Sequence, residues 1–195
     1  NEGIWVEPIA ITKIEDRNGN LIEQVVPETR EVLSEETAYI MSDMMEGVVN
    51  EGTASSIRQF FNRPAAGKTG TSQNYTDAWF IGYTPQFVAG CWLGFDDARV
   101  KFGGSYGQGG RAAAPIWGRF MKLLYSDENF DFPVEYFLMP ENVVEAQVCS
   151  ITGMLANSSC PSVTDLINKK LNNRKCSMTH EVRDSLALPP ISNDE

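Results

Sequence analysis

The most regular pattern in the chain is a helical repeat of apolar side chains over residues 35–50. Ser34 precedes this stretch, and the acidic residues Glu35 and Glu36 fall where a first turn would begin, which favours a helix start. Gly52 marks the expected end of the helix. The pattern therefore predicts a helix over 35–50 with a methionine-rich stripe facing the core: Ala38, Ile40, Met41, Met44, Met45 and Val48.

Strand-like segments lie on both sides of this helix. Before it, residues 4–14 and 21–26 are rich in β-branched and apolar residues, and Asn18-Gly19 lies between them. An Asn-Gly pair between two such runs is a strong hairpin signal. After the helix, three further segments predict antiparallel strands: 67–72, 77–83 and 87–95.

A second helix is predicted over residues 114–126, with Pro115 near its start. Its expected apolar face, which would pack across the three strands, consists of Ile116, Phe120, Leu123 and Leu124. The glycine-rich residues 103–110 before it predict a loop, in which Tyr106 could border a substrate groove. Trp79, Trp92 and Trp117 are predicted to be core residues. The fold class is therefore α+β, antiparallel strands with flanking helices.

Composition limits the function classes. The chain has 195 residues, 42% of them hydrophobic, which is enough for a domain with a real core. A net charge of −10 argues against a nucleic-acid partner, because phosphate binding needs clustered Lys and Arg. No apolar run reaches the roughly 18–20 residues of a membrane span. Residues 127–195 carry three cysteines and weak periodicity, and are predicted to form a C-terminal extension of the main segment, 1–126.

The candidate chemistry lies in Gly67-Lys68-Thr69-Gly70-Thr71, at the start of a predicted strand. The lysine offers a cation, the threonines offer hydroxyls, and the glycines let a ligand approach the backbone N–H groups. Such a set suits a carboxylate and a developing oxyanion. A phosphate-binding loop is excluded because Asn62 stands where that motif needs its first glycine, with Pro64 inside the loop.

Longer stretches around this motif carry a family resemblance. AAGKTGTS, TDAWFIGYTPQFVAGCWLGFDD and GGRAAAPIWGRFMK, within about residues 65–122, resemble the final part of the transpeptidase domain of class A (bifunctional) penicillin-binding proteins. GVVNEGTASS (47–56) extends the resemblance, which covers roughly residues 1–125. The tail around VCSITGMLANSSCP is similar to C-terminal segments of some members, though less specifically.

The resemblance implies a serine acyltransferase that cross-links peptidoglycan stem peptides and is acylated by β-lactams, without a cofactor. Lys68 would set the electrostatics of the nucleophile region and attract the substrate carboxylate. Thr69 and Thr71 would bind that carboxylate, Gly70 would keep the strand surface open, and the Thr71 N–H would form half of the oxyanion hole. The implied location is the extracytoplasmic face of the bacterial inner membrane, with membrane anchoring and a glycosyltransferase domain in the parent protein.

One departure from the family pattern concerns the nucleophile. No serine in the chain has a lysine three residues later, and Ser72-Gln73-Asn74 lies within the strand motif itself, so its match to Ser-x-Asn is a coincidence. We therefore expect an N-terminal half of the same domain to supply Ser-x-x-Lys, and we expect this chain alone to be inactive. Two alternatives are a β-lactam-hydrolysing relative and a non-catalytic interaction or zinc-binding module.

The cysteines leave several uses open. Cys149, Cys160, Cys176 and His180, the only histidine, form a Cys3His set that could hold structural zinc, although no Cys-x-x-Cys knuckle is present. In an extracytoplasmic protein a disulfide between Cys149 and Cys160 is the more natural expectation, and unpaired thiols are the third possibility. Cys91, in an apolar strand, is predicted to be a buried core thiol. Asp96-Asp97 is interpreted as a solvated turn rather than a metal site.

Overall fold

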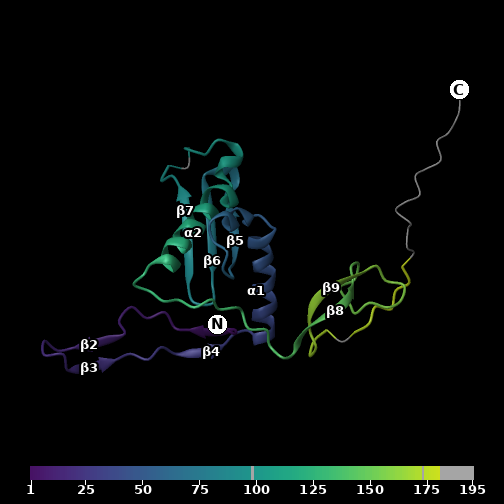
Figure 1. The fold of residues 1–195 in the computed structure, drawn as a ribbon, viewed down its shortest axis with the longest axis horizontal. Helices are drawn as coiled ribbons and strands as arrows, with labels where there is room; N and C mark the ends of the chain where they lie inside the picture. The colour runs from purple at the N-terminus through teal and green to yellow at the C-terminus, as the bar shows by residue number, and fades with distance from the viewer. Residues whose placement is uncertain (98, 173, 181–195) are drawn as a thin grey trace. The chain divides into compact units, whose positions relative to one another are not determined.

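The structure is a computed structural model that describes residues 1–97, 99–172 and 174–180 (Figure 1). The chain forms two compact units, Asn1–Pro140 and a second that begins at Glu141. The boundary expected after residue 126 stays a prediction. In the structure, the stretch just beyond it belongs to the first unit: the ring centroids of Phe132 and Phe87 lie 4.8 Å apart, and Arg63 donates to the Phe132 carbonyl at 2.7 Å.

A three-stranded antiparallel sheet is the centre of the first unit. Its strands are β5 (Ala66–Thr71), β6 (Asp77–Tyr83) and β7 (Val88–Gly94), in the order β5-β6-β7. The predicted strands and their antiparallel pairing are confirmed. The register places Thr69 opposite Phe80 and Phe80 opposite Cys91.

Two helices pack on this sheet. Helix α1 (Glu35–Asn50) has the predicted bounds, and the Ser34 hydroxyl caps it by accepting from the Thr37 N–H at 3.3 Å. The predicted core stripe was wrong for Met41 and Met44, which are exposed. Helix α2 (Gly109–Ser126) contacts all three strands, while α1 contacts β5 (Figure 1). The short helix η1 (Ser55–Gln59) adds Ile57 to the shared core. Neither α-helix, within the described part of the chain, has the length and apolar character that a bilayer crossing requires.

Helix α2 differs from the prediction in its start. It begins at Gly109, so that Pro115 lies inside it rather than near its first turn. The two glycines had indicated a loop, but here they allow close packing: a Cβ on Gly109 would overlap the carbonyl oxygens of Gly70 and Trp79. Pro115 cannot donate to the carbonyl four residues earlier, and packing of the helix on the sheet outweighs that loss.

The buried face of α2 also differs from the prediction. Ile116, Phe120 and Leu123 are 46%, 51% and 70% exposed, so the predicted apolar face was wrong except for the partly buried Leu124. The core is filled instead by Trp117 and Met121, which pack with Phe80. The other buried members of this core are Val49, Ala54, Ile57, Phe61, Ala65, Ala113 and Ala114.

The tryptophan prediction holds for only one of three side chains. Trp117 is buried, whereas Trp79 and Trp92 are 44% and 46% exposed. Side chains alternate between the faces of a strand. Because Phe80 points into the core beneath α2, its neighbour Trp79 points to the other face, where its ring lies 6.1 Å from that of Trp92.

The N-terminal segment forms two separate strand pairs rather than one hairpin. Strands β2 (Lys13–Glu15) and β3 (Leu21–Gln24) pair across the predicted Asn18-Gly19 turn. Strand β1 (Ile4–Val6) instead pairs with β4 (Thr29–Glu31). Pro8 lies between β1 and β2 and has no N–H for a ladder, which accounts for the interruption.

The second unit contains one antiparallel pair, β8 (Val143–Cys149) and β9 (Ser162–Asn168). Cys149 is the last residue of β8 and lies opposite Ser162. The loops after the two strands bring the other cysteines of the tail back toward this end of β8, as an isolated bridge between Val148 and Leu155 and one between Leu155 and Lys175 show.

Candidate functional site

The predicted Lys-Thr-Gly residues lie on β5, which is an edge strand of the sheet within the described part of the chain. Just beyond β5, Ser72 donates its N–H to the Asp77 carbonyl at 3.0 Å. Hydrogen-bonded pairs alternate along an antiparallel ladder. The N–H groups of Lys68 and Gly70 therefore face β6, and those of Thr69 and Thr71 face the free edge.

A cleft of about 740 Å³ lies at the end of β5 and includes Thr69 and Thr71 in its wall. The other lining residues are Thr53, Ser72, Gln73, Asn74, Tyr75, Gln108, Gly110 and Arg111. Lys68 does not line the cleft. It starts from the opposite face of the strand, is exposed, and donates its Nζ proton to the Thr69 carbonyl at 3.0 Å.

Neighbouring segments hold both threonine hydroxyls. The Thr71 Oγ1 accepts a hydrogen bond from the Gly109 N–H, the first residue of α2, at 3.0 Å. The hydroxyls of Thr69 and Thr53 lie 2.9 Å apart and share one hydrogen bond. A Cβ on Gly110 would overlap the Thr53 carbonyl oxygen, so this glycine allows the first turn of α2 to pack directly against the segment between α1 and η1.

The cleft favours anions although the chain as a whole is acidic. None of the ten lining residues is a carboxylate, and Arg111 is the cation among them. Arg111 donates to the Ser105 hydroxyl at 2.6 Å and lies over the Tyr106 ring, 5.1 Å from its centroid. It stands in the first turn of α2, where the helix dipole adds positive potential.

Sequence reasoning missed Thr53, Gln108 and Arg111 as parts of this wall. The Gly-Gly-Arg run was visible in the sequence, but its closeness to Thr71 arises from contacts across 38 residues. The turn in η2 (Gln73–Tyr75) was also missed, since Asn74 and Tyr75 adopt left-handed backbone angles, φ 64° and 58°, that no glycine signals.

Ser72 has a structural use in this turn. Its hydroxyl accepts from the Asp77 N–H at 2.7 Å and lies 2.7 Å from the Thr76 hydroxyl. The pKa of the Asp77 carboxyl is lowered mainly by the Trp92 indole N–H, which donates to it at 3.0 Å, and further by the Thr76 hydroxyl. These bonds explain why a serine occupies this position of the turn.

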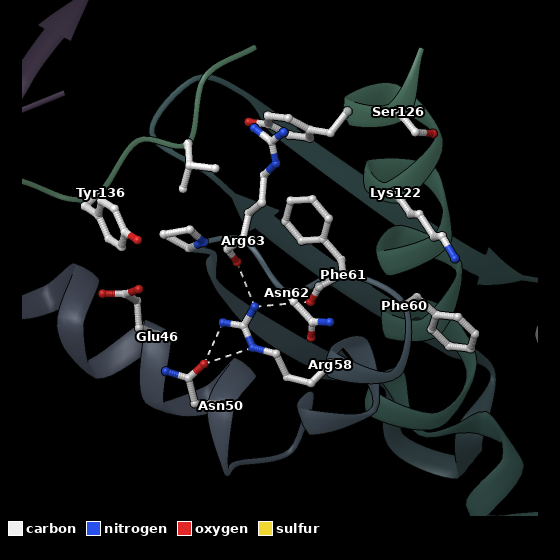
Figure 2. A pocket seen from close by; sticks show the side chains of 13 residues that line it. Glu46, Asn50, Arg58, Phe60, Phe61, Asn62, Arg63, Lys122, Ser126 and Tyr136 are labelled. Atoms are coloured by element: carbon white, nitrogen blue, oxygen red, sulfur yellow. Dashed lines mark hydrogen bonds between the residues drawn. The ribbon is translucent and has the colours of Figure 1, made fainter. Parts of the chain in front are cut away.

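A second cleft of about 610 Å³ contains none of the Lys-Thr-Gly residues (Figure 2). Arg58 lies in its wall and donates to Asn50 Oδ1 and to the carbonyls of Phe61 and Arg63, the last at 2.7 Å. Burial lowers the pKa of Arg58 and raises the pKa of nearby Glu46. These bonds use the guanidinium to join α1 to the segment after η1. Arg58 therefore has a structural role in the wall of this cleft.

The cysteines of the second unit gather around the histidine. The Sγ atoms of Cys149 and Cys176 each lie 3.3 Å from His180 Nε2. One ligand atom from each of these residues and from Cys160 lies within 4.8 Å of all the others. The Thr152 hydroxyl, followed by the backbone N–H groups of Thr152 and Ile151, lowers the pKa of Cys149 to about 6.

The structure contradicts two expectations about the cysteines. All four are free thiols, so the expected disulfide between Cys149 and Cys160 is absent. The two residues belong to a cluster in which the sulfurs surround an imidazole instead of pairing. Cys91 is half-buried at the edge of the core rather than fully buried, and burial raises its pKa.

Comparisons with known proteins match both units. Residues 1–122 match the family model of the penicillin binding protein transpeptidase domain, and residues 139–169 match that of the penicillin-binding protein 1A C-terminal domain. Penicillin-binding protein 1A of Aquifex aeolicus is 39% identical over 166 residues, which are 84% of this chain and 22% of that protein. The protein of the same name from Clostridium novyi is 34% identical over 80% of this chain and 17% of its own length.

The chain thus spans about a fifth of the length of these curated relatives. Among solved structures, penicillin-binding protein 1A from Haemophilus influenzae has a TM-score of 0.71 at 24% identity, covering 86% of this chain and 30% of that one. This likeness agrees with the α+β fold described above.

Proposed function

Because the chain belongs to the penicillin-binding protein transpeptidase family, we propose that it supplies the Lys-Thr-Gly strand of a peptidoglycan D,D-transpeptidase. The observation that carries the proposal is the cleft beside β5. It combines the hydroxyls of Thr69 and Thr71 with the Arg111 cation and lacks any carboxylate. A wall of this kind suits the terminal carboxylate of a D-Ala peptide or the carboxylate of a β-lactam.

Each strand residue has a separate task in this proposal. The hydroxyls of Thr69 and Thr71 donate to the substrate carboxylate, which Arg111 attracts from the helix side. The Thr71 N–H, on the free edge of β5, stabilises the oxyanion that forms on the scissile carbonyl, a contribution of about 3 kcal/mol in comparable enzymes. Lys68 adds positive potential from the opposite face of the strand.

The serine nucleophile comes from outside these 195 residues, because no serine here is followed by a lysine at the third position. The reaction takes place on the extracytoplasmic side of the membrane, where stem peptides are cross-linked. In the isolated chain the strand binds a carboxylate ligand without acylation.

The test is a titration of the 195-residue chain with an acyl-D-Ala-D-Ala peptide, followed by amide NMR. The signals of Thr71, Gly109 and Arg111 should move with the free acid, and a peptide ending in a carboxamide should move them at least about tenfold less at equal concentration. Arg111→Gln should weaken binding of the acid, and Lys169→Gln in the second unit is the matched control. Equal responses to acid and amide would refute carboxylate recognition.

A second readout concerns the nucleophile. The intact mass of the chain should stay unchanged after exposure to a penicillin, because no serine here has the lysine at the third position that would activate it. An adduct on the chain would overturn the external origin of the nucleophile and leave the carboxylate test unaffected.

A further inference from the structure

The cluster in the second unit has the dimensions of a tetrahedral metal site. With Zn–S near 2.3 Å and Zn–N near 2.0–2.1 Å, ligand atoms at the corners of a tetrahedron stand about 3.8 Å apart for two sulfurs and about 3.6 Å apart for sulfur and nitrogen. His180 Nε2 lies 3.3 Å from the sulfurs of Cys149 and Cys176. Each of the four ligand atoms lies within 4.8 Å of the others.

Three separate segments bring these ligands together, and each is held by backbone bonds. Cys149 is the last residue of β8, and its backbone N–H donates to the Met154 carbonyl at 2.7 Å. The backbone N–H of Cys176 donates to the Leu155 carbonyl at 2.8 Å. The Asn157 N–H donates to the Cys160 sulfur at 3.3 Å, the kind of outer bond that orients a metal-bound thiolate.

Asn157 also links two of the segments through its side chain. Its Nδ2 donates to the carbonyls of Cys176 and Met178, at 2.8 and 3.1 Å, while its N–H contacts Cys160. The ligands are thus placed by a hydrogen-bonded frame as well as by sequence spacing. This frame takes the place of the Cys-x-x-Cys knuckle that the sequence lacks.

The second unit has little apolar core to hold such a frame together. Apart from two of the cysteines, its buried apolar side chains in the described residues are Val143, Val148 and Ile167. Its regular structure there is one two-stranded pair, and such a pair is marginally stable alone. In a unit this small a single apolar core supplies little stability, and a disulfide or a metal often adds to it; no disulfide is formed here.

We propose that Cys149, Cys160, Cys176 and His180 bind one zinc ion that stabilises the C-terminal unit. Three thiolates and an imidazole form a closed four-ligand set, which is typical of structural zinc, and thiolates disfavour magnesium and calcium. A disulfide would use two of the three sulfurs and would give no role to the third thiol or to the histidine. The proposal is independent of the carboxylate site on β5.

The test measures zinc by elemental analysis in the full chain, purified without chelator, and compares single variants. We expect about one zinc per chain in the unsubstituted chain and in Cys91→Ser, whose thiol lies outside the cluster. Cys160→Ser and His180→Ala should each lower zinc affinity at least about tenfold. Cobalt substituted for zinc should give the visible absorption of a tetrahedral thiolate site, and Cys160→Ser should lose it.

A separate measurement distinguishes loss of a ligand from loss of the whole fold. All four tryptophans, Trp5, Trp79, Trp92 and Trp117, lie in the first unit, so their emission should be unchanged in the zinc-site variants. Alkylation of the denatured, unreduced chain counts free thiols. Two protected cysteines together with absence of zinc would overturn the proposal in favour of a disulfide, and full zinc retention in Cys160→Ser would overturn the ligand set.

Discussion

Alanine substitutions at Met121 and Leu123 would distinguish the two faces of α2 by their effects on unfolding. Both side chains are apolar and only two positions apart, but Met121 is fully buried and Leu123 is 70% exposed. Replacing a buried methionine by alanine costs about 2–5 kcal/mol, because it removes apolar contacts and leaves a cavity. Replacing an exposed leucine changes stability by less than about 0.5 kcal/mol.

The difference is large enough to measure by urea unfolding. With a slope of about 2 kcal/mol per molar urea, a loss of about 3 kcal/mol lowers the midpoint by about 1.5 M, and the exposed substitution moves it by less than about 0.25 M. Tryptophan fluorescence is the suitable probe, because every tryptophan belongs to the first unit. Tryptophan fluorescence therefore reports unfolding of the first unit, including α2, without a contribution from the second unit.

Two outcomes would refute the assignment of the buried face. Equal losses in the two variants, or a larger loss for Leu123→Ala, would place Leu123 in the core and turn α2 by about 200°, the angle between positions two residues apart. If Met121→Ala does not fold, Met121→Leu keeps most of the volume and should cost less than about 1.5 kcal/mol.

Two other substitutions test hydrogen bonds at the end of β5 and at the start of β6. Thr71→Val removes the acceptor of the Gly109 N–H and should lower the free energy of unfolding by about 1 kcal/mol. Thr71→Ser keeps the hydroxyl and should leave the free energy of unfolding unchanged, and urea midpoints would measure both effects. The Trp92 indole and neighbouring hydroxyls hold the pKa of Asp77 below its usual 3.8, so its stabilisation is complete above that pH and lost as pH falls through the folded-state value. Asp77→Asn should therefore reduce the fall of the urea midpoint as the pH decreases below about 4, where the Asp77 carboxyl takes up its proton; an unchanged acid limb in Asp77→Asn would contradict this origin.

Local signals were sufficient for most elements of the first unit. The Ser34 cap and the apolar repeat located α1, and short apolar runs located the three strands of the sheet. These features depend on neighbours within a few residues, which a sequence shows directly. Pairing of β1 with β4 instead joins segments on either side of the β2–β3 hairpin, a contact that no local pattern indicates.

The buried face of α2 was harder to predict because apolar residues occupy both sides of the helix. The buried side is distinguished by small residues, Ala113, Ala114 and Gly118, among larger ones. A Cβ on Gly118 would stand 3.3 Å from the Ile57 carbonyl oxygen, so the small residue permits close contact with η1. Small size therefore indicates the packed side here, and total hydrophobicity does not.

The candidate site was predictable as a motif but not as a three-dimensional wall. Thr69 and Thr71 were found because their strand carries Lys-Thr-Gly, while Arg111 was missed because it reaches the cleft through α2. The bond between the Thr71 hydroxyl and the Gly109 N–H joins these parts across 38 residues. The hydroxyl that we expect to bind a carboxylate thus also caps the helix that presents Arg111. A shift in the first turn of α2 would therefore change the positions of both groups, so carboxylate recognition depends on helix packing as well as on the strand motif.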